Sequence, residues 1–580
     1  MSPDLPPVVP SVTAELVGAL SPRLRKRLDA GVAKLAARPV TRDGDTVRIA
    51  VDDDTDVTLR LSGTTVTSAD AIQCGCLLAP DCLHRAAAAS AAPVAEDAPP
   101  PPAASDAPEA RQDGAPETSA PQPHPEAITA ARAVYDAAAA VLDAGTDGAG
   151  AVAQAELLRA AHTARLAGLH RAFAAAVSVV TEVRAARSAD PGYRLADLTR
   201  ALAEVLTVAH RLPHATGADL AELRGTARQP YRPDGSLRLY GLFSEPVLTA
   251  TGYAGAVTWT ADADGRLYTV SDVAPGGPSR ATGAANRTVR VGDTALTHRE
   301  LSRAGLAVSG ATVSPTGRLG AGAGVRAVRA SGAAWRAEPL DRLWAVPAAE
   351  QVARALDGGR DLLFLEVTLR GAVRETTGDC LLADCAGLPL RLATAHDDPA
   401  LPYRDNLRLL AAAGGRSLRI IARLTPGQLP RALLLATEHP SDPDTRVDLG
   451  LDRLLHADLP TGPLAPPPPP VPTTDEAPLH LLRRRVHQTV SGGRRVLATA
   501  HGGTGDSTRL RRLGLSTAAD LLDHLHTTAT HRSRDAFGRL LPTNTHDFAE
   551  AWLAAALYTD AVERTLCANA WGATTTSAIS

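Results

Sequence analysis

The sequence predicts a multidomain protein of the α+β class, in which helical and β-rich segments alternate along the chain. Its 580 residues exceed one domain of roughly 100–200 residues and suffice for about three to five. Two proline-rich segments interrupt the chain, and near residue 226 the spacing of apolar residues changes from helical to strand-like. We therefore expect seven parts: a small β-meander with a helix (1–90), a linker (91–125), a helical domain (126–225), a β-rich domain (226–345), a second β domain (346–456), a linker (457–478) and a helical domain (479–580).

The N-terminal part is expected to begin with an amphipathic helix, because four apolar residues from Leu24 to Leu35 recur at intervals of 4, 4 and 3. Three short runs of β-forming residues follow, at Thr46–Val51, Val57–Leu61 and Thr64–Thr67. A cluster of cysteines and an alanine-rich helix complete this part of the chain.

Both linkers are expected to lack a packed core. Residues 91–125 consist mainly of Pro, Ala, Ser and acidic residues, so burial cannot offset the entropy of ordering them, and we expect disorder. The second linker contains Pro466–Pro470, which favours polyproline II. A plain spacer is the simpler interpretation of this run, and a ligand for a proline-recognition domain is the alternative.

The helical domains are indicated by apolar residues at helical spacing. The middle domain should hold one long helix over 158–180 and another over 195–205, separated by Asp190-Pro191-Gly192. The C-terminal domain has apolar faces at 521–525 and 552–557.

The two β domains are indicated by alternating runs and turn residues. Asp262-Ala263-Asp264-Gly265 lies between two such runs and predicts a hairpin. From 361 to 438 the expected order is strand, strand, strand, helix, strand, strand, which is compatible with an OB-like barrel.

Composition and charge exclude several classes of protein. The net charge of −3 provides no protein-wide positive field for general nucleic-acid binding. The N-terminus has prolines where a signal peptide needs a basic patch and an apolar core, and no apolar stretch approaches the roughly 20 residues that cross a bilayer. Six cysteines in so long a chain are too few for a disulfide framework. We therefore expect a soluble, cytoplasmic protein without a membrane partner.

The most informative stretch is a cysteine–histidine cluster with the spacing C-x-C-x5-C-x-H, formed by Cys74, Cys76, Cys82 and His84. Zn²⁺ prefers four tetrahedral sulfur and nitrogen ligands, and two short ligand pairs joined by a loop can enclose one ion. Four protein ligands leave no position for water, so we expect one structural zinc ion, with Gly75 allowing a sharp turn between the thiolates. Buried free thiols beside a chance histidine are the alternative; a redox site would need a C-x-x-C pair, which this stretch lacks.

The same residues resemble the SWIM zinc finger, in which C-x-C-x(n)-C-x-H follows a short β-meander and a helix begins at the histidine. Cys74, Cys76, Cys82 and His84 correspond one for one to the ligands of that family, although Leu77 replaces a frequent proline and the loop of five residues is short. The resemblance covers roughly residues 20–90. It implies a zinc-bound module that binds DNA or protein, and a separate ATPase subunit as a partner to test.

Basic residues crowd the helix before the cluster. Arg23, Arg25, Lys26 and Arg27, with Lys34 and Arg38 beyond them, face a single acid, Asp29. We name the first four as candidate contacts to nucleic-acid phosphates, the alternative being a solvated helix face. A second run of arginines over 483–512 allows the same two interpretations.

No recognisable catalytic motif accompanies these features. Glycine-rich stretches at 320–324 and 501–508 lack the residues of dinucleotide or phosphate loops, and neither H-E-x-x-H nor G-x-S-x-G is found. We therefore assign no catalytic or cofactor-binding residue besides the zinc ligands. The sequence predicts a non-enzymatic, zinc-binding scaffold or adaptor whose finger binds DNA, RNA or a protein. The alternative is an enzyme with a site in 226–455 and the finger as its targeting module.

Overall fold

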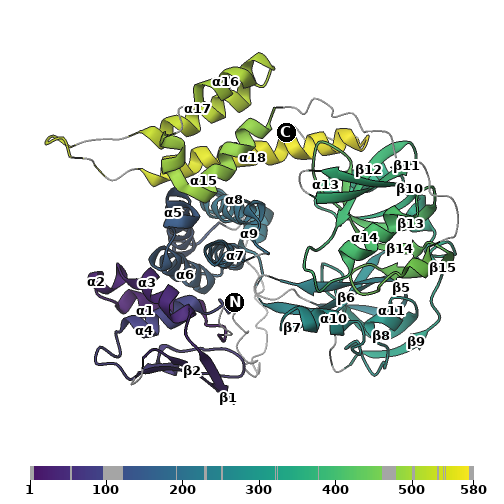
Figure 1. Cartoon of the computed structure of the whole chain (residues 1–580), viewed down its shortest axis with the longest axis horizontal. Helices are drawn as coiled ribbons and strands as arrows, with labels where there is room; N and C mark the ends of the chain where they lie inside the picture. The colour runs from purple at the N-terminus through teal and green to yellow at the C-terminus, as the bar shows by residue number, and fades with distance from the viewer. Residues whose placement is uncertain are drawn as a thin grey trace, which may run out of the picture. The chain divides into compact units, whose positions relative to one another are not determined.

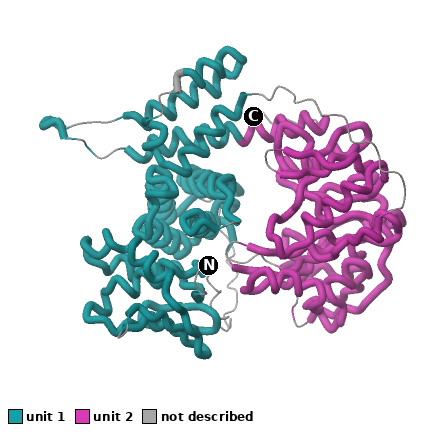
Figure 2. The backbone as a smooth tube through the Cα atoms, in the orientation of Figure 1, with its two compact units in different colours: residues 1–227, 477–559 teal, residues 228–476, 560–580 magenta. Residues whose placement is uncertain are grey.

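The computed structural model confirms a multidomain α+β protein with helices and antiparallel sheets (Figure 1). It describes residues 5–52, 55–95, 122–190, 192–226, 231–249, 252–320, 322, 324–375, 378–459, 478–499, 503–531, 535–539, 541 and 544–573. Most of both expected linkers, at 96–121 and 460–477, lies outside the described residues. The chain forms two compact units, shown in Figure 2: unit 1 comprises 1–227 and 477–559, and unit 2 comprises 228–476 and 560–580.

Unit 1 begins with a small module of helices around a four-stranded antiparallel sheet in the order β1-β2-β3-β4. Its elements are α1 (Pro10–Ala19), α2 (Pro22–Arg25), α3 (Leu28–Ala36), β1 (Val40–Asp43), β2 (Thr46–Ala50), β3 (Asp56–Arg60), η1 (Ala69–Ala71), β4 (Ile72–Cys74) and α4 (Leu83–Ala91). Every second residue of β2 and β3 is buried, as the alternation predicts, and these side chains pack in one core with α1, α3 and the alanines of α4.

Two expected elements of this module differ in the structure. The single helix expected from Leu24 to Leu35 is divided into α2 and α3. The expected strand Thr64–Thr67 is not a strand of the sheet; instead Val66 forms isolated bridge contacts with Val8, because the N-terminal segment occupies the place beside it.

The rest of unit 1 is a helical bundle. It contains α5 (Pro125–Gly148), α6 (Ala151–Leu166), α7 (His170–Arg187), α8 (Leu195–Arg211), η2 (Leu212–His214), α9 (Gly217–Arg224), α15 (His480–Thr499), α16 (Gly503–Arg512), α17 (Ser516–Thr530) and the first part of α18 (Thr545–Ala570). The helix expected over 158–180 is divided into α6 and α7, because Gly168 adopts a φ of +77° and ends the first of them.

Helix α15 crosses α5 with almost no space between the two backbones. A Cβ added to Gly145 would lie 2.3 Å from the backbone nitrogen of Gly493, and both glycines have positive φ. Beside this crossing Arg494 is only 3% exposed and its guanidinium forms an ion pair with Asp143 at 2.5 Å. The C-terminal helices are therefore part of the same bundle as 126–225 (Figure 1).

Unit 2 begins with a five-stranded antiparallel sheet in the order β7-β6-β5-β8-β9. Its strands are β5 (Arg232–Leu248), β6 (Tyr253–Ala261), β7 (Leu267–Pro275), β8 (Gly305–Val313) and β9 (Arg326–Ala330), accompanied by α10 (Pro278–Ala284), α11 (His298–Leu301), α12 (Arg342–Ala345) and α13 (Ala348–Leu356). The hairpin at 262–265 is confirmed, because Ala261 pairs with Leu267 across it.

The second sheet of unit 2 has six strands in the order β12-β11-β10-β13-β14-β15. Its elements are β10 (Leu362–Glu375), β11 (Gly378–Cys385), β12 (Leu388–Thr394), α14 (Tyr403–Ala411), β13 (Ser417–Leu424), β14 (Arg431–His439), β15 (Asp442–Asp448) and η3 (His456–Asp458). A parallel pairing of β12 with β14 joins the five strands β10–β14 into a ring, with α14 connecting the third strand to the fourth. The expected order of elements over 361–438 is thus confirmed.

Across the described part of the chain, none of the helices combines the length and the apolar character that crossing a membrane requires.

Candidate metal centre

The four sequence-predicted ligands converge at one end of the N-terminal sheet. Cys74 is the last residue of β4, Cys76 follows two residues later, Cys82 is the N-cap of α4, and His84 lies in the first turn of that helix. One donor atom from each residue lies within 4.8 Å of the other three. The prediction from the sequence that these four side chains lie close together is confirmed.

One of the donor–donor separations equals that expected in a tetrahedral zinc site. Zn–S bonds of about 2.3 Å and Zn–N bonds of about 2.0–2.1 Å hold neighbouring sulfur and nitrogen ligands about 3.6 Å apart. The Sγ atom of Cys74 lies 3.6 Å from Nδ1 of His84. The donor set, three sulfurs and one imidazole, is also one that zinc uses in structural sites. The residues present therefore fit a zinc ion.

The three thiols have perturbed pKa values. Burial raises the pKa of Cys74 to about 12 and also raises the pKa of Cys82. At Cys76 burial acts in the same direction, but hydrogen bonds from the backbone N–H of Leu78 and from neighbouring thiols outweigh it and lower the pKa. Three thiols this close repel one another as thiolates, so a divalent cation is the natural source of the compensating charge.

Arg85, which sequence reasoning missed, stabilises the loop between the ligands. Its guanidinium is buried and donates hydrogen bonds to the carbonyl oxygens of Ile72 and Ala69, each at 2.5 Å, and to that of Pro80. Ile72 and Pro80 precede Cys74 and Cys82 by two residues, so one side chain fixes both ends of the ligand loop. The sequence offered one indication of this role, which is that Arg85 directly follows the candidate ligand His84.

Two details of the loop differ from the expectation or add to it. Gly75 does not adopt a positive φ, and a Cβ there would meet no atom within 4 Å, so the turn does not require glycine and that expectation was wrong. At the tip of the loop Leu77 is 103% exposed and Leu78 is 63% exposed. Both side chains are thus largely in contact with solvent.

The four basic candidates have different environments. Arg25 donates hydrogen bonds to the carbonyl oxygens of Leu20 at 3.1 Å and Gly18 at 2.5 Å, so it caps the end of α1. Arg23 and Lys26 lie in and just after α2, and Arg27 lies at the start of α3. Of the four, Arg27 lines the groove beside His84 that is described next.

A different basic set surrounds a groove beside the metal ligands. This basic groove has a volume of about 330 Å³ and lies between α3, the turn after β2, and the start of α4. Its walls include Arg27, Lys34 and Arg38 on one side, and Asp52 and His84 on the other. Within the described part of the chain, no residue pairs with the side chains of these three basic residues. Three cationic groups thus lie in the groove that His84 also lines.

Some arginines of the second run form ion pairs with acids. Arg485 contacts Asp506 at 2.6 Å, and Arg511 contacts Asp520 at 2.7 Å and Asp523 at 2.8 Å. These pairs hold the C-terminal helices together, which agrees with the solvated or structural interpretation of this run.

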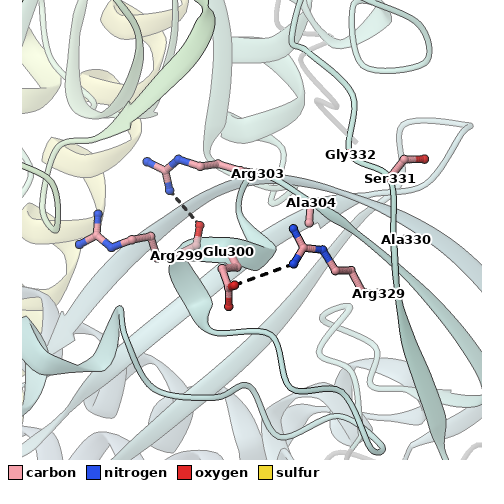
Figure 3. A pocket seen from close by; sticks show the side chains of 8 residues that line it. All are labelled: Arg299, Glu300, Arg303, Ala304, Arg329, Ala330, Ser331 and Gly332. Carbon is pink, nitrogen blue, oxygen red and sulfur yellow. Dashed lines mark hydrogen bonds and ion pairs between the residues drawn. The ribbon is translucent and has the colours of Figure 1, made fainter.

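Unit 2 has a hollow of about 510 Å³, the arginine hollow, which is drawn in Figure 3. Arg299, Arg303 and Arg329 line it, with Glu300 3.9 Å from Arg329. Arg299 and Arg303 both form ion pairs with Asp452, so two of the three guanidinium groups are fixed by internal contacts. The hollow therefore has a basic lining.

Two groups with perturbed pKa values lie inside unit 2. Burial raises the pKa of the Asp448 carboxyl, which accepts a hydrogen bond from Ser302 at 3.0 Å. Burial lowers the pKa of His298 to about 4, and its Nδ1 atom lies 2.7 Å from the hydroxyl of Thr258. Neither residue lines the arginine hollow, and both are enclosed by protein.

Comparisons with protein-family models, with curated proteins and with solved structures find no match for this chain. Its function is therefore inferred from the geometry of its sites.

Proposed function

We propose that the N-terminal module is a SWIM-type zinc finger and that the chain is a non-enzymatic scaffold or adaptor that uses this module to bind nucleic acid. One observation carries the proposal: the basic groove of Arg27, Lys34 and Arg38 shares a wall with the zinc ligand His84. Zinc would fix the loop and the start of α4, and so hold that wall of the groove in place. Thiolate ligands persist in a reducing compartment, which supports a cytoplasmic location.

The groove suits phosphate groups. Lysine and arginine side chains without an internal partner contribute the electrostatic part of nucleic-acid affinity, because binding releases counterions from the phosphates. His84 would contribute through its position rather than its charge, since a metal-bound imidazole is neutral. DNA and RNA share the phosphate backbone, so both are tested side by side.

The test measures binding of fluorescein-labelled single-stranded and duplex DNA and RNA by fluorescence anisotropy at 50 and 200 mM salt. The groove variant Lys34→Glu, Arg38→Glu should lose at least about tenfold in affinity. The matched control Arg23→Glu, Lys26→Glu makes the same charge change at residues outside the groove and should lose less than about twofold. Equal losses would mean that net charge, not the groove, governs binding, and no binding by the wild type would exclude nucleic acid.

The zinc assignment is tested separately by metal analysis after dialysis against a chelator that removes loosely held ions. The purified chain should retain about one zinc ion, and Cys74→Ser should lose most of it. Cys385→Ser, at a buried thiol of β11, is the control and should retain it. A full complement of zinc in Cys74→Ser would refute the assignment.

The exposed pair Leu77 and Leu78 favours a second candidate function, binding of a protein. An apolar loop tip fixed by metal ligands on both sides can enter an apolar pocket of a partner at little entropic cost. A separate ATPase subunit is the partner to test first, by co-purification with the wild type and with Leu77→Ser, Leu78→Ser. Loss of that subunit in the leucine variant but not in the groove variant would favour protein binding.

The β domain over 346–456 is consistent with a nucleic-acid role. Closure of β10–β14 by the β12–β14 pairing, with a helix before the fourth strand, supports an OB-like barrel, a fold that binds oligonucleotides across its second and third strands. The alternative function, an enzyme with a site in 226–455, has the arginine hollow as its candidate location.

A further inference from the structure

The basic groove has an apolar surface as well as a charged one. We call this surface the apolar lining; it consists of Ala30, Gly31, Leu35, Val51 and Leu83. Val51 and Leu83 are half-buried, so each leaves part of its side chain in contact with solvent. A Cβ added to Gly31 would lie 3.2 Å from Cγ of Leu83, so α3 and the start of α4 are in close contact here. A ligand in the groove would therefore meet both cations and apolar groups.

The charges of the groove are distributed unevenly between its two sides. Arg27, Lys34 and Arg38 are exposed and follow one another at intervals of seven and four residues, which is a helical repeat. The other side holds His84 and the exposed carboxylate of Asp52. A carboxylate repels a phosphate but accepts hydrogen bonds from amino and hydroxyl groups. The groove thus suits a ligand that is anionic on the side of α3 and uncharged on the side of Asp52.

His84 brings an aromatic ring to the same groove. Residues 1–95 contain no Phe, Tyr or Trp, and His84 is their only histidine. The one aromatic ring of the N-terminal module therefore lies in the wall of the basic groove. Unstacked nucleic-acid bases pack on aromatic side chains, histidine included, and against apolar side chains. The wall opposite the cations has the chemistry that a base requires.

Single-stranded and duplex nucleic acids would use such a groove differently. In a duplex the bases are stacked, so a protein reaches their edges and the phosphates but not their faces. The apolar lining would then have no counterpart in the ligand. An unpaired nucleotide carries a phosphate and an accessible base face together, which is the combination that a charged groove with a stacking surface recognises.

We propose that the basic groove binds an unpaired nucleotide of single-stranded DNA or RNA. Its phosphates contact Arg27, Lys34 and Arg38, and its base packs against the apolar lining and His84. This inference rests on the proposed function and deepens it, because it names the single strand as the ligand. Apolar packing does not distinguish one base from another, so binding should tolerate changes of sequence.

The first test compares ligands and needs no variant. The full chain, with the Cys74 centre (Cys74, Cys76, Cys82 and His84) loaded with zinc, is titrated into fluorescein-labelled oligothymidylate of about twelve nucleotides at low salt. A strand of the same length that lacks its bases, and a duplex of that length, are measured in parallel by anisotropy. Both should bind at least about fivefold more weakly than the intact strand. Equal affinity for the intact and the abasic strand, or tighter binding of the duplex, would overturn the inference.

The second test changes the apolar lining. Val51→Asn should lower the affinity for the intact strand at least about fivefold and alter that for the abasic strand less than about twofold. Val40→Asn is the matched control, because Val40 is also half-buried against the core of the N-terminal module but lies outside the groove. It should leave both affinities within about twofold of the wild type. Circular dichroism and zinc content verify that both variants are folded, and equal losses in the two would refute the role of the lining.

The outcomes separate this inference from the proposed function. If Lys34→Glu, Arg38→Glu weakens binding while the wild type does not distinguish intact from abasic strands, the groove binds phosphates alone; the proposed function then stands and the inference fails. If the wild type binds none of these ligands, both fail. The same comparison with an oligouridylate of equal length shows whether RNA is bound as DNA is.

Discussion

The carboxylate of Asp29 accepts a hydrogen bond from the backbone N–H of Ala151 at 3.0 Å, and so the basic helix α3 caps the first turn of α6. Gly150 makes this contact feasible, because a Cβ at that position would lie 2.2 Å from the carboxylate. The single acid in the basic segment therefore joins the N-terminal module to the helical bundle within unit 1. Arg187 adds a second contact to the same carboxylate at 3.1 Å.

Removing the Asp29 carboxylate should weaken the contact between α3 and the first turn of α6. Asp29→Ala should lower the free energy of unfolding by about 1 kcal/mol, mainly through loss of the N-cap, since the half-exposed ion pair with Arg187 contributes little. The amide of Ala151 should also exchange with solvent faster, as measured by hydrogen–deuterium exchange. Asp43→Ala, an exposed acid of β1, is the control. Unchanged exchange at Ala151 would contradict the assignment.

Arg85→Ala should lower the affinity of the Cys74 centre for zinc, although Arg85 is not itself one of the proposed ligands. Three carbonyl groups around the ligand loop lose a charged donor, and we expect a cost of about 3 kcal/mol together with weaker zinc retention against a chelator. Arg48→Ala, at an exposed position of β2, removes the same charge from the module and should retain zinc as the wild type does. If both variants release zinc equally, Arg85 has no special role.

The glycine crossing of α5 and α15 should not accept a side chain. Gly145→Ala and Gly493→Ala each place a methyl group against backbone atoms at a positive φ, and each should destabilise unit 1 by at least about 2 kcal/mol in denaturant unfolding. Gly505→Ala is the control, because a Cβ at Gly505 meets no atom within 4 Å. A stable Gly493→Ala protein would show that the helices cross less closely.

The stability of unit 2 should fall in acid because of His298. Its pKa is about 4 in the folded chain and 6.5 ordinarily, so above pH 6.5 the ring is neutral in both states and contributes no pH dependence. Below pH 6.5 the unfolded chain binds a proton that the folded chain does not, which costs about 2 kcal/mol at pH 5 and about 3 kcal/mol below pH 4.

Denaturant unfolding at pH 7 and pH 5 measures this effect. His298→Gln retains a polar side chain beside Thr258 but does not titrate, so the difference between the two pH values should shrink by about 2 kcal/mol. His456→Gln, at an exposed position, should leave the difference as in the wild type. A wild-type difference that His298→Gln does not reduce would assign the acid sensitivity to other groups.

Local patterns predicted the elements of the chain well. The strands Leu388–Thr394 and Ser417–Leu424 occur in the order predicted for 361–438, because alternation of apolar residues and flanking turn residues is a property of a few neighbouring positions. The divided helix at Gly168 was missed, since a glycine within a helical pattern is often tolerated and only its positive φ ends the helix here.

The candidate metal ligands could be grouped without a structure, because Cys74, Cys76, Cys82 and His84 are so close in the chain that any compact turn brings them together. The basic residues that line the basic groove could not be identified from the sequence alone. Arg25 was indistinguishable from Lys34 in the sequence, yet one caps a helix and the other lines the groove. Likewise no periodicity records that α8 and α18 meet, although Nδ1 of His210 lies 3.7 Å from Oε1 of Glu550. Contacts between distant segments depend on how whole helices pack, and that information is spread over the entire core.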